Sequence, residues 1–219
     1  MRRMPFSIAF VVLISASAAL AADAVTINRA SPSVEHRKFD RNNPPSDMPQ
    51  LEPQEAAVTK SVYGIGTQFS VQLEGEQKKL GKSVARVKVT SVSVDVSLKI
   101  TVWLPHDASR VIADHEEGHR KLSEYFYKDA EKIARNVAQG YVGKVYEGQG
   151  TDTEAATRSA IDKAINELSQ KYMGQTQSLS VKANAVFDEL TQHSRNQKIS
   201  VEKAMKDSID RAMKEKETK

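Results

Sequence analysis

The strongest constraint on the fold is an unbroken alternation of apolar and polar side chains over residues 92–104. Every second residue there is apolar: Val92, Val94, Val96, Leu98, Ile100, Val102 and Leu104. Successive side chains of a strand point to opposite faces, so this spacing predicts one strand, or two, with one face on a core. A similar alternation over residues 85–89 loses its phase at Thr90-Ser91. A slip of one residue predicts a β-bulge or a change of strand at that point.

A further strand is predicted within residues 62–73, although Gly64 and Gly66 interrupt its pattern. Pro105 ends this part of the chain, because proline lacks the amide hydrogen that a sheet interior needs. Residues 57–105 are therefore expected to form a small, mostly antiparallel sheet with one face in solvent.

From Asp107 onward, apolar residues recur every three or four positions, which is the spacing of one face of an α-helix. Asp107 or Ser109 can cap the first helix, and four glycines between positions 140 and 150 predict a loop. Strands first and helices after predict an α+β fold. We expect one domain over residues 57–219, with strands over 57–105 and helices over 107–217.

The N-terminal residues 1–21 have the pattern of a secretory signal peptide. Arg2 and Arg3 precede an apolar run from Phe6 to Ile14, and Ala19-Leu20-Ala21 forms an A-x-A cleavage pattern. A transmembrane anchor is the alternative, but the run is too short to span a bilayer and small residues follow it. We expect a bacterial protein that is exported to the periplasm or the exterior, with no stable membrane anchor after cleavage.

Residues 22–56 hold five of the seven prolines and show little apolar periodicity. Proline fixes the backbone and removes amide donors, so this segment is expected to be a flexible leader of loop or polyproline structure. Such a leader would act as a mobile tether or as a propeptide that covers a cleft.

The composition of the 219-residue chain narrows the possible chemistry. The chain has no cysteine, which excludes disulfides, iron–sulfur clusters, thiolate zinc sites and a cysteine nucleophile. Any metal must therefore be bound by histidine, aspartate or glutamate. Removing residues 1–21 with their two arginines lowers the net charge from +4 to +2, which does not favour a nucleic-acid partner. The oligomeric state is not determined by the sequence.

The segment His115-Glu116-Glu117-Gly118-His119 matches the pattern H-E-x-x-H on the first predicted helix. Both histidines belong to its apolar face, which also carries Ile112, Leu122, Phe126, Ala130, Ile133 and Val137. One turn apart, the two imidazoles can bind a single ion at about 2.0–2.1 Å. Glu116 lies about 100° around the helix from His115, where it can deprotonate a metal-bound water without being a ligand.

Zinc is the expected metal, because two imidazoles without a thiolate suit it. The alternative is a pair of core histidines that hydrogen-bond to backbone groups or carboxylates. A catalytic zinc site also needs a third protein ligand and an open position for water. His193 is favoured, since it follows Val186 and Leu190 at steps of four and three and so continues the inward face of a predicted helix. Glu167 and Asp188 are the alternatives.

Other roles are assigned by residue type alone. Tyr127, Tyr172 and Arg195 are candidates to stabilise an oxyanion. Asp114 and Asp188 are candidates to orient the imidazoles through their second ring nitrogens.

Three segments resemble a family of bacterial secreted proteins of unknown function that are described as predicted zinc-dependent proteases. The segments are Val102-Trp103-Leu104-Pro105, His115-Glu116-Glu117-Gly118-His119 and Asp188-Glu189-Leu190-Thr191-Gln192-His193. The resemblance covers roughly residues 60–210 and implies a secreted zinc protease with His193 as the third ligand. Phe187 and Ser194 depart from the family pattern, which has tyrosine and glycine at these positions.

The sequence therefore predicts an exported zinc metalloprotease of the H-E-x-x-H type that hydrolyses peptide or protein substrates, with Glu116 as the base. The alternative is a non-catalytic periplasmic binding or envelope-assembly protein whose metal site is structural or vestigial.

Overall fold

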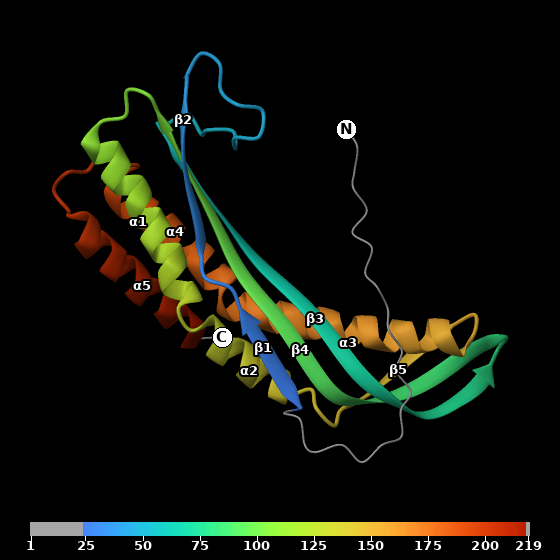
Figure 1. The fold of residues 1–219 in the computed structure, drawn as a ribbon. Helices are drawn as coiled ribbons and strands as arrows, with labels where there is room; N and C mark the ends of the chain where they lie inside the picture. The colour runs from blue at the N-terminus through green and yellow to red at the C-terminus, as the bar shows by residue number, and fades with distance from the viewer. Residues whose placement is uncertain (1–23, 218–219) are drawn as a thin grey trace.

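The computed structural model describes residues 24–217, so the predicted signal peptide over residues 1–21 lies outside the described residues. Strands come first and helices dominate the second half of the chain (Figure 1). The elements are β1 (Val25–Arg29), β2 (Ser33–Phe39), β3 (Val58–Lys79), β4 (Lys82–Pro105), α1 (Arg110–Tyr127), α2 (Ala130–Gln139), β5 (Val145–Gly150), α3 (Thr153–Gln175), α4 (Gln177–Thr191) and α5 (Val201–Glu217).

The long strand β4 organises the sheet. β3 pairs with it antiparallel along almost its whole length, from Val58↔Trp103 to Lys79↔Lys82. The other side of β4 is shared by three shorter strands: β1 and β2 run parallel to it, and β5 runs antiparallel. The sheet is therefore mixed, and the prediction of a mostly antiparallel sheet is wrong.

The error comes from the segment that was expected to be a flexible leader. Residues 25–29 and 33–39 form β1 and β2, with Pro32 in the connection between them. A strand that reaches β4 from far upstream is free to run parallel to it, whereas a hairpin neighbour must run antiparallel. Residues 40–57, which hold the other four prolines of the segment, form no helix or strand apart from an isolated bridge between Asp40 and Asn43.

The alternation over residues 85–104 is confirmed as a single strand with a bulge. Ser70 of β3 pairs with Ser91 and Val71 pairs with Val89, so Thr90 is the extra residue of β4. The apolar residues before and after the bulge are all buried. The extra residue therefore restores the phase of the alternation, so that both parts of the strand turn the same face to the core.

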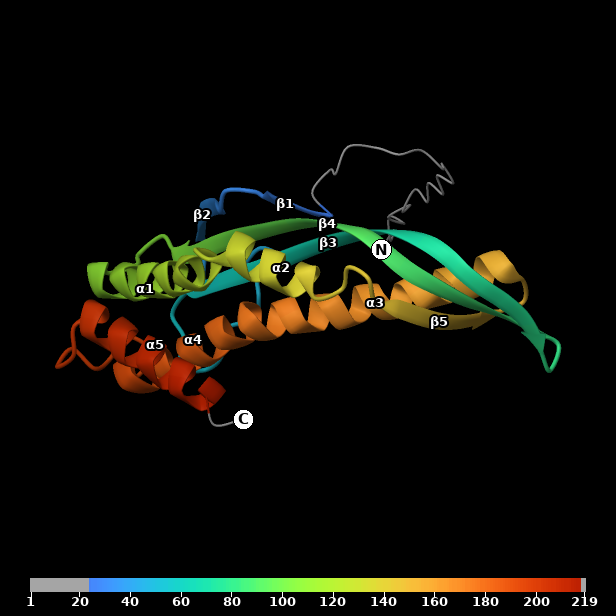
Figure 2. The ribbon, with the colours of Figure 1, turned by 90° about the horizontal axis from the view of Figure 1, so that it is seen from below.

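The five helices of the described residues all belong to the second half of the chain, and α3 runs along the concave side of the curved β3–β4 ribbon (Figure 2). One cluster of buried apolar residues joins the sheet to α2 and α3. A second cluster joins α1, α4 and α5: Leu122, Phe126, Leu179, Ala183, Phe187, Ala204 and Ala212. The helical face expected to be continuous over residues 112–137 is divided between α1 and α2.

The glycine-rich segment expected to be a loop contains β5. A Cβ atom on Gly148 would lie 2.0 Å from the backbone oxygen of Ala156, and one on Gly150 would lie 2.4 Å from the backbone nitrogen of Ala156. These two glycines do not form a turn. They allow the backbone of β5 to approach the backbone of α3 closely.

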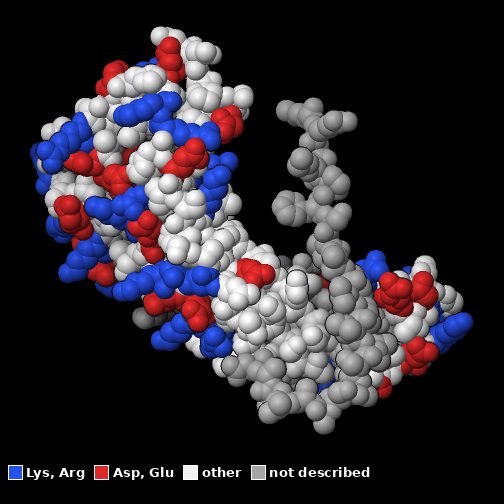
Figure 3. Space-filling model, viewed as in Figure 1, with Lys and Arg blue, Asp and Glu red and all other residues white. Residues whose placement is uncertain are grey.

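None of the helices within residues 24–217 combines the length and the apolar composition that a membrane span requires. On the face shown in Figure 3, lysine and arginine side chains alternate with aspartate and glutamate over the end that carries α1 and α5. Neither sign forms a continuous patch on that face.

Candidate metal centre

The H-E-x-x-H segment lies on α1, as predicted, and of the two candidate caps it is Ser109, not Asp107, that begins the helix. The Ser109 side chain accepts a hydrogen bond from the amide of Ile112, which starts the helix. This register turns His115 and Glu116 inward, with exposed fractions of 5% and 4%.

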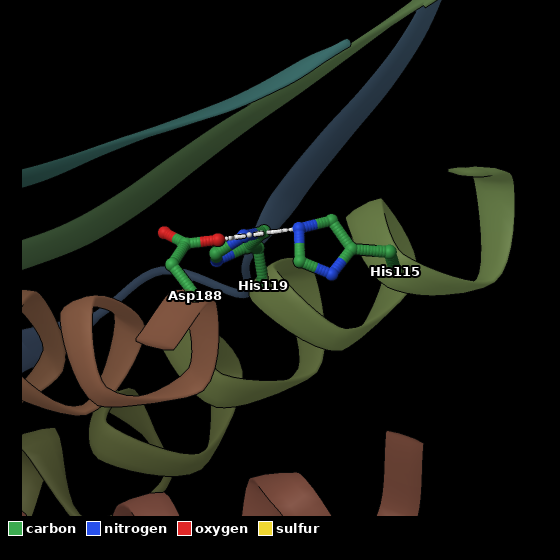
Figure 4. Close-up of side chains that lie close together, drawn as sticks. All are labelled: His115, His119 and Asp188. Carbon is green, nitrogen blue, oxygen red and sulfur yellow. Dashed lines mark hydrogen bonds and ion pairs between the residues drawn. The ribbon is translucent and has the colours of Figure 1, made fainter. Parts of the chain in front are cut away.

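Asp188 of α4 faces both imidazoles (Figure 4). Its Oδ1 lies 3.0 Å from Nε2 of His119 and 3.2 Å from Nε2 of His115. The two Nε2 atoms are themselves 3.1 Å apart. Three potential ligand atoms from two helices thus meet at one point.

This triangle fits a tetrahedral metal ion. Ligands at about 2.0–2.1 Å from such an ion are about 3.3–3.4 Å apart, slightly farther than the atoms measured here. Hydrogen bonds satisfy the arrangement less well, because both Nε2 atoms face one carboxylate oxygen and also each other. A divalent cation is a partner that all three lone pairs can share.

The charges of the three groups are coupled. Burial would raise the pKa of the Asp188 carboxyl, but hydrogen bonds and charge interactions with His115 and His119 outweigh burial and lower it. Burial would likewise lower the pKa of His119, but Asp188, Glu116 and Asn184 outweigh burial and raise it. The site therefore stabilises positive charge between the helices, which is the field that a cation needs.

The two imidazoles are supported differently. Nδ1 of His119 lies 2.6 Å from Oδ1 of Asn184, whose amide nitrogen donates to the backbone oxygen of Ser180 at 2.8 Å. This places the proton on Nδ1 and leaves the Nε2 lone pair for a metal. Nδ1 of His115 is buried and has no hydrogen-bond partner in the described part of the chain. Its ring instead stacks on Phe187, with centroids 5.0 Å apart.

Gly118 allows this stacking. A Cβ atom on Gly118 would lie 2.5 Å from Cζ of Phe187 and 3.2 Å from Cγ1 of Val201. The variable position before the second histidine therefore needs glycine for helix packing, because the Phe187 ring occupies the space that a side chain would fill.

Glu116 is held by the sheet. The Thr59 hydroxyl of β3 donates to Oε2 of Glu116 at 2.7 Å. Burial raises the pKa of Glu116, and His119, the Thr59 hydroxyl and His115 counteract part of that effect. A carboxylate with a raised pKa beside a metal site is suited to accept and return a proton near neutral pH.

A cleft of about 320 Å³ lies over these groups, between the start of β3 and α4. Its walls include Thr59, Ser61 and Tyr63 from β3, and Ser180 and Asn184 from α4. His115, Glu116, His119, Asp188 and His193 all line it. The potential ligands are therefore reachable from solvent, which a catalytic site requires and a sealed structural site does not.

His193 reaches the cleft by a route that the sequence did not predict. The expectation that a helix continues through His193 is wrong, because α4 ends at Thr191 and residues 192–194 have positive φ values of 50°, 52° and 72°. The reversed backbone still brings Nδ1 of His193 to 3.4 Å from Oδ1 of Asp188. In this structure Asp188, not His193, completes the group of three, and a role for His193 as a ligand stays a prediction.

Five other sequence candidates are absent from the described lining of the cleft: Glu167, Tyr127, Tyr172, Arg195 and Asp114. Glu167 accepts a hydrogen bond from the Tyr146 hydroxyl at 3.0 Å. The hydroxyl of Tyr127 donates to the backbone oxygens of Ala30 and Val96. Glu167 and Tyr127 therefore have partners outside the cleft. None of the three residues expected to stabilise an oxyanion lines the cleft in the described part of the chain.

Sequence reasoning missed three supporting residues, which are Asn184, Thr59 and Gly118. Asn184 had a usable signal, since it lies one helical turn before Asp188 on the same face of α4. Thr59 had none, because it lies 57 residues from Glu116 and only the packing of β3 on α1 brings them together.

The chain was also compared with known proteins, and no family model, curated protein or solved structure matches it.

Proposed function

We propose that this protein is an exported zinc-dependent hydrolase that cleaves peptide bonds. The observation that carries the proposal is the convergence of His115, His119 and Asp188 beside the buried carboxylate of Glu116 in an open cleft. Two histidines, one carboxylate and a neighbouring glutamate form the residue set of mononuclear zinc hydrolases. The resemblance of the motifs to secreted zinc-dependent proteases supports the same conclusion.

His115, His119 and Asp188 would hold the zinc ion. When bound, zinc supplies a coordinated water with a pKa of about 7 and polarises the carbonyl of the substrate. Asn184 orients the His119 ring, and Phe187 holds the plane of His115. The geometry of these side chains is fixed before any substrate arrives, which lowers the cost of reaching the transition state.

Glu116 moves the proton. The Thr59 hydroxyl holds Oε2 in place, and the Glu116 carboxylate accepts the proton of the attacking water. Glu116 then delivers this proton to the nitrogen of the leaving amine, which cannot depart as an anion. Burial serves both steps, because it raises the pKa of Glu116 toward the working pH.

A second candidate function is favoured by the position of His193. An imidazole 3.4 Å from Asp188 is close enough to become a fourth protein ligand after a small movement. A site closed in this way would be structural, and the protein would be a periplasmic binding or envelope-assembly module.

The deciding experiment compares the zinc content and peptidase activity of the purified wild type with those of Glu116→Gln. We expect one zinc per chain in both proteins, with hydrolysis only in the wild type. Glu117→Gln is the matched control, because its carboxylate is bonded to His36 and Arg120 outside the cleft. Equal activity in Glu116→Gln and the wild type would overturn the catalytic role, and a zinc-free wild type would overturn the site.

A further inference from the structure

The sheet has an unpaired edge beside the metal centre. β3 is bonded to β4 on one side, and within residues 24–217 no other strand pairs with β3. An unpaired edge presents a row of backbone N–H and C=O groups that can bind another extended chain.

The hydrogen bonds of β4 show which residues of β3 face that edge. The amide of Val92 donates to Ala24, and the carbonyl of Val96 accepts from Ala30. Both bonds point toward β1, and backbone groups of successive strand residues point to alternate sides. In this part of β4, even-numbered residues therefore face β1 and β2, and odd-numbered residues face β3.

The pairing of β3 with β4 then shows to which side the backbone groups of each β3 residue point. Lys60 pairs with Thr101 and Val62 with Lys99, so these two β3 residues use their backbone groups in the bonds to β4. Thr59, Ser61 and Tyr63 turn their N–H and C=O groups to the free edge. No backbone–backbone hydrogen bond outside the regular elements reaches these three residues from the described chain.

The same three residues line the cleft with their side chains, opposite α4. Their hydroxyls are already engaged: Thr59 holds Glu116, Ser61 bonds to Ser123 at 2.7 Å, and Tyr63 bonds to the backbone oxygen of Ser123 at 2.7 Å. The backbone groups are what this wall of the cleft offers to a ligand. They lie beside the base and the potential metal ligands.

We propose that the substrate is an extended, unfolded polypeptide segment that binds as an added strand along Thr59, Ser61 and Tyr63. This inference rests on the proposed function and names the form of its substrate. Main-chain pairing would lay the scissile bond across the metal centre without demanding a particular sequence. The opposite wall carries Val181, which is 60% exposed, and the small residue Ala185. These residues leave room for alternate side chains of the added strand.

Amide hydrogen exchange tests the proposal directly. The ligand is oxidised insulin B chain, added to zinc-loaded Glu116→Gln so that the complex persists. We expect exchange of the Thr59, Ser61 and Tyr63 amides to slow by at least about tenfold on binding. The amides of Lys60 and Val62 are internal controls, because β4 already protects them. Binding without this alternate pattern would overturn the proposal.

Hydrolysis of the same peptide by the wild type separates the two claims. Cleavage without edge protection leaves a peptidase but overturns strand addition. Edge protection without cleavage supports strand addition and overturns the peptidase. Absence of both overturns both claims.

A second test changes the edge itself. Ser61→Pro removes an amide that points to the free edge, a position that proline tolerates in a strand. Ser61→Ala is the control, since it loses the same hydroxyl but keeps the amide. We expect the proline variant to bind the peptide about tenfold more weakly than the alanine variant, with zinc content unchanged. Equal peptide affinities in two folded variants would contradict strand addition.

Discussion

The two ends of the β3–β4 hairpin use the same pair of strands but are covered differently. At the end beside the candidate metal centre, which we call the near end, the inward residues of β3 carry hydroxyls. A cleft of about 320 Å³ lies there between β3 and the helices α1 and α4. At the opposite end of the hairpin, which we call the far end, the backbone of β5 packs directly on the backbone of α3. Only glycine fits at Gly148 and Gly150.

The difference shows how one ribbon serves two purposes. Small residues at the far end give close packing, which resists any added atom. Hydroxyls at the near end cannot pack in this way, because each needs a hydrogen-bond partner, and they take those partners from α1. We expect substitutions at the near end to change metal binding and catalysis, and substitutions at the far end to change stability.

The largest effect is expected at the near end for Asp188→Ala. Loss of a ligand should weaken zinc binding by more than about 100-fold, since even an outer partner contributes about 10–100-fold. Competition with a chromophoric chelator measures this affinity. Glu189→Ala is the control, because the neighbouring Glu189 is exposed and lies 3.5 Å from Arg211. Equal zinc affinities in the two variants would exclude Asp188 as a ligand.

The matching prediction for the far end concerns Gly148→Val. Its new Cβ would lie 2.0 Å from a backbone atom of α3, so the helix itself must move. We expect a loss of about 3 kcal/mol in the free energy of unfolding, measured by urea titration. Gly75→Ala is the control, since a Cβ there meets nothing within 4 Å. A stability loss below about 0.5 kcal/mol would show that the far end is loosely packed.

Asn184→Ala should have a smaller effect, confined to the near end. Without its acceptor, His119 loses the bond that fixes its proton on Nδ1, and zinc affinity should fall about tenfold. Asn184→Asp retains the accepting oxygen and should recover most of that loss. Calorimetric zinc titration distinguishes the variants, and an unchanged affinity in Asn184→Ala would remove Asn184 from the site.

The smallest effect is the pH dependence of zinc affinity. The pKa of His119 is raised, so protons compete with zinc already above the ordinary histidine value of about 6.5. Affinity should be full at higher pH and fall as the pH drops through this raised pKa. Far-end variants should show the same midpoint as the wild type. A wild-type midpoint below about 6.5 would contradict the charge coupling to Asp188.

The parts of the fold that local patterns determine were predictable. The long alternation predicted β4, and the slip in its phase predicted the bulge. Apolar residues spaced three and four positions apart predicted α1 with both histidines facing inward. β1 and β2 were missed because each is short, neighbours Pro32, and pairs with residues far along the chain: Asn28 binds Asp95 across 67 positions. Periodicity carries no information about such a partner.

The site was predictable to the same degree. Its first two potential ligands, His115 and His119, lie on one helix, so spacing alone brings them together. The third depends on how α4 crosses α1, and that crossing depends on Phe187 packing where Gly118 has no side chain. The sequence favoured His193 because it extended a helix that in fact ends at Thr191.

Anomalous diffraction at the zinc edge, from crystals of the zinc-loaded protein, tests the central claim most directly. We predict one peak bonded to Nε2 of His115, Nε2 of His119 and a carboxylate oxygen of Asp188, with the fourth position facing the cleft. A peak bonded to His193 in place of Asp188, or no peak between α1 and α4, would contradict the account.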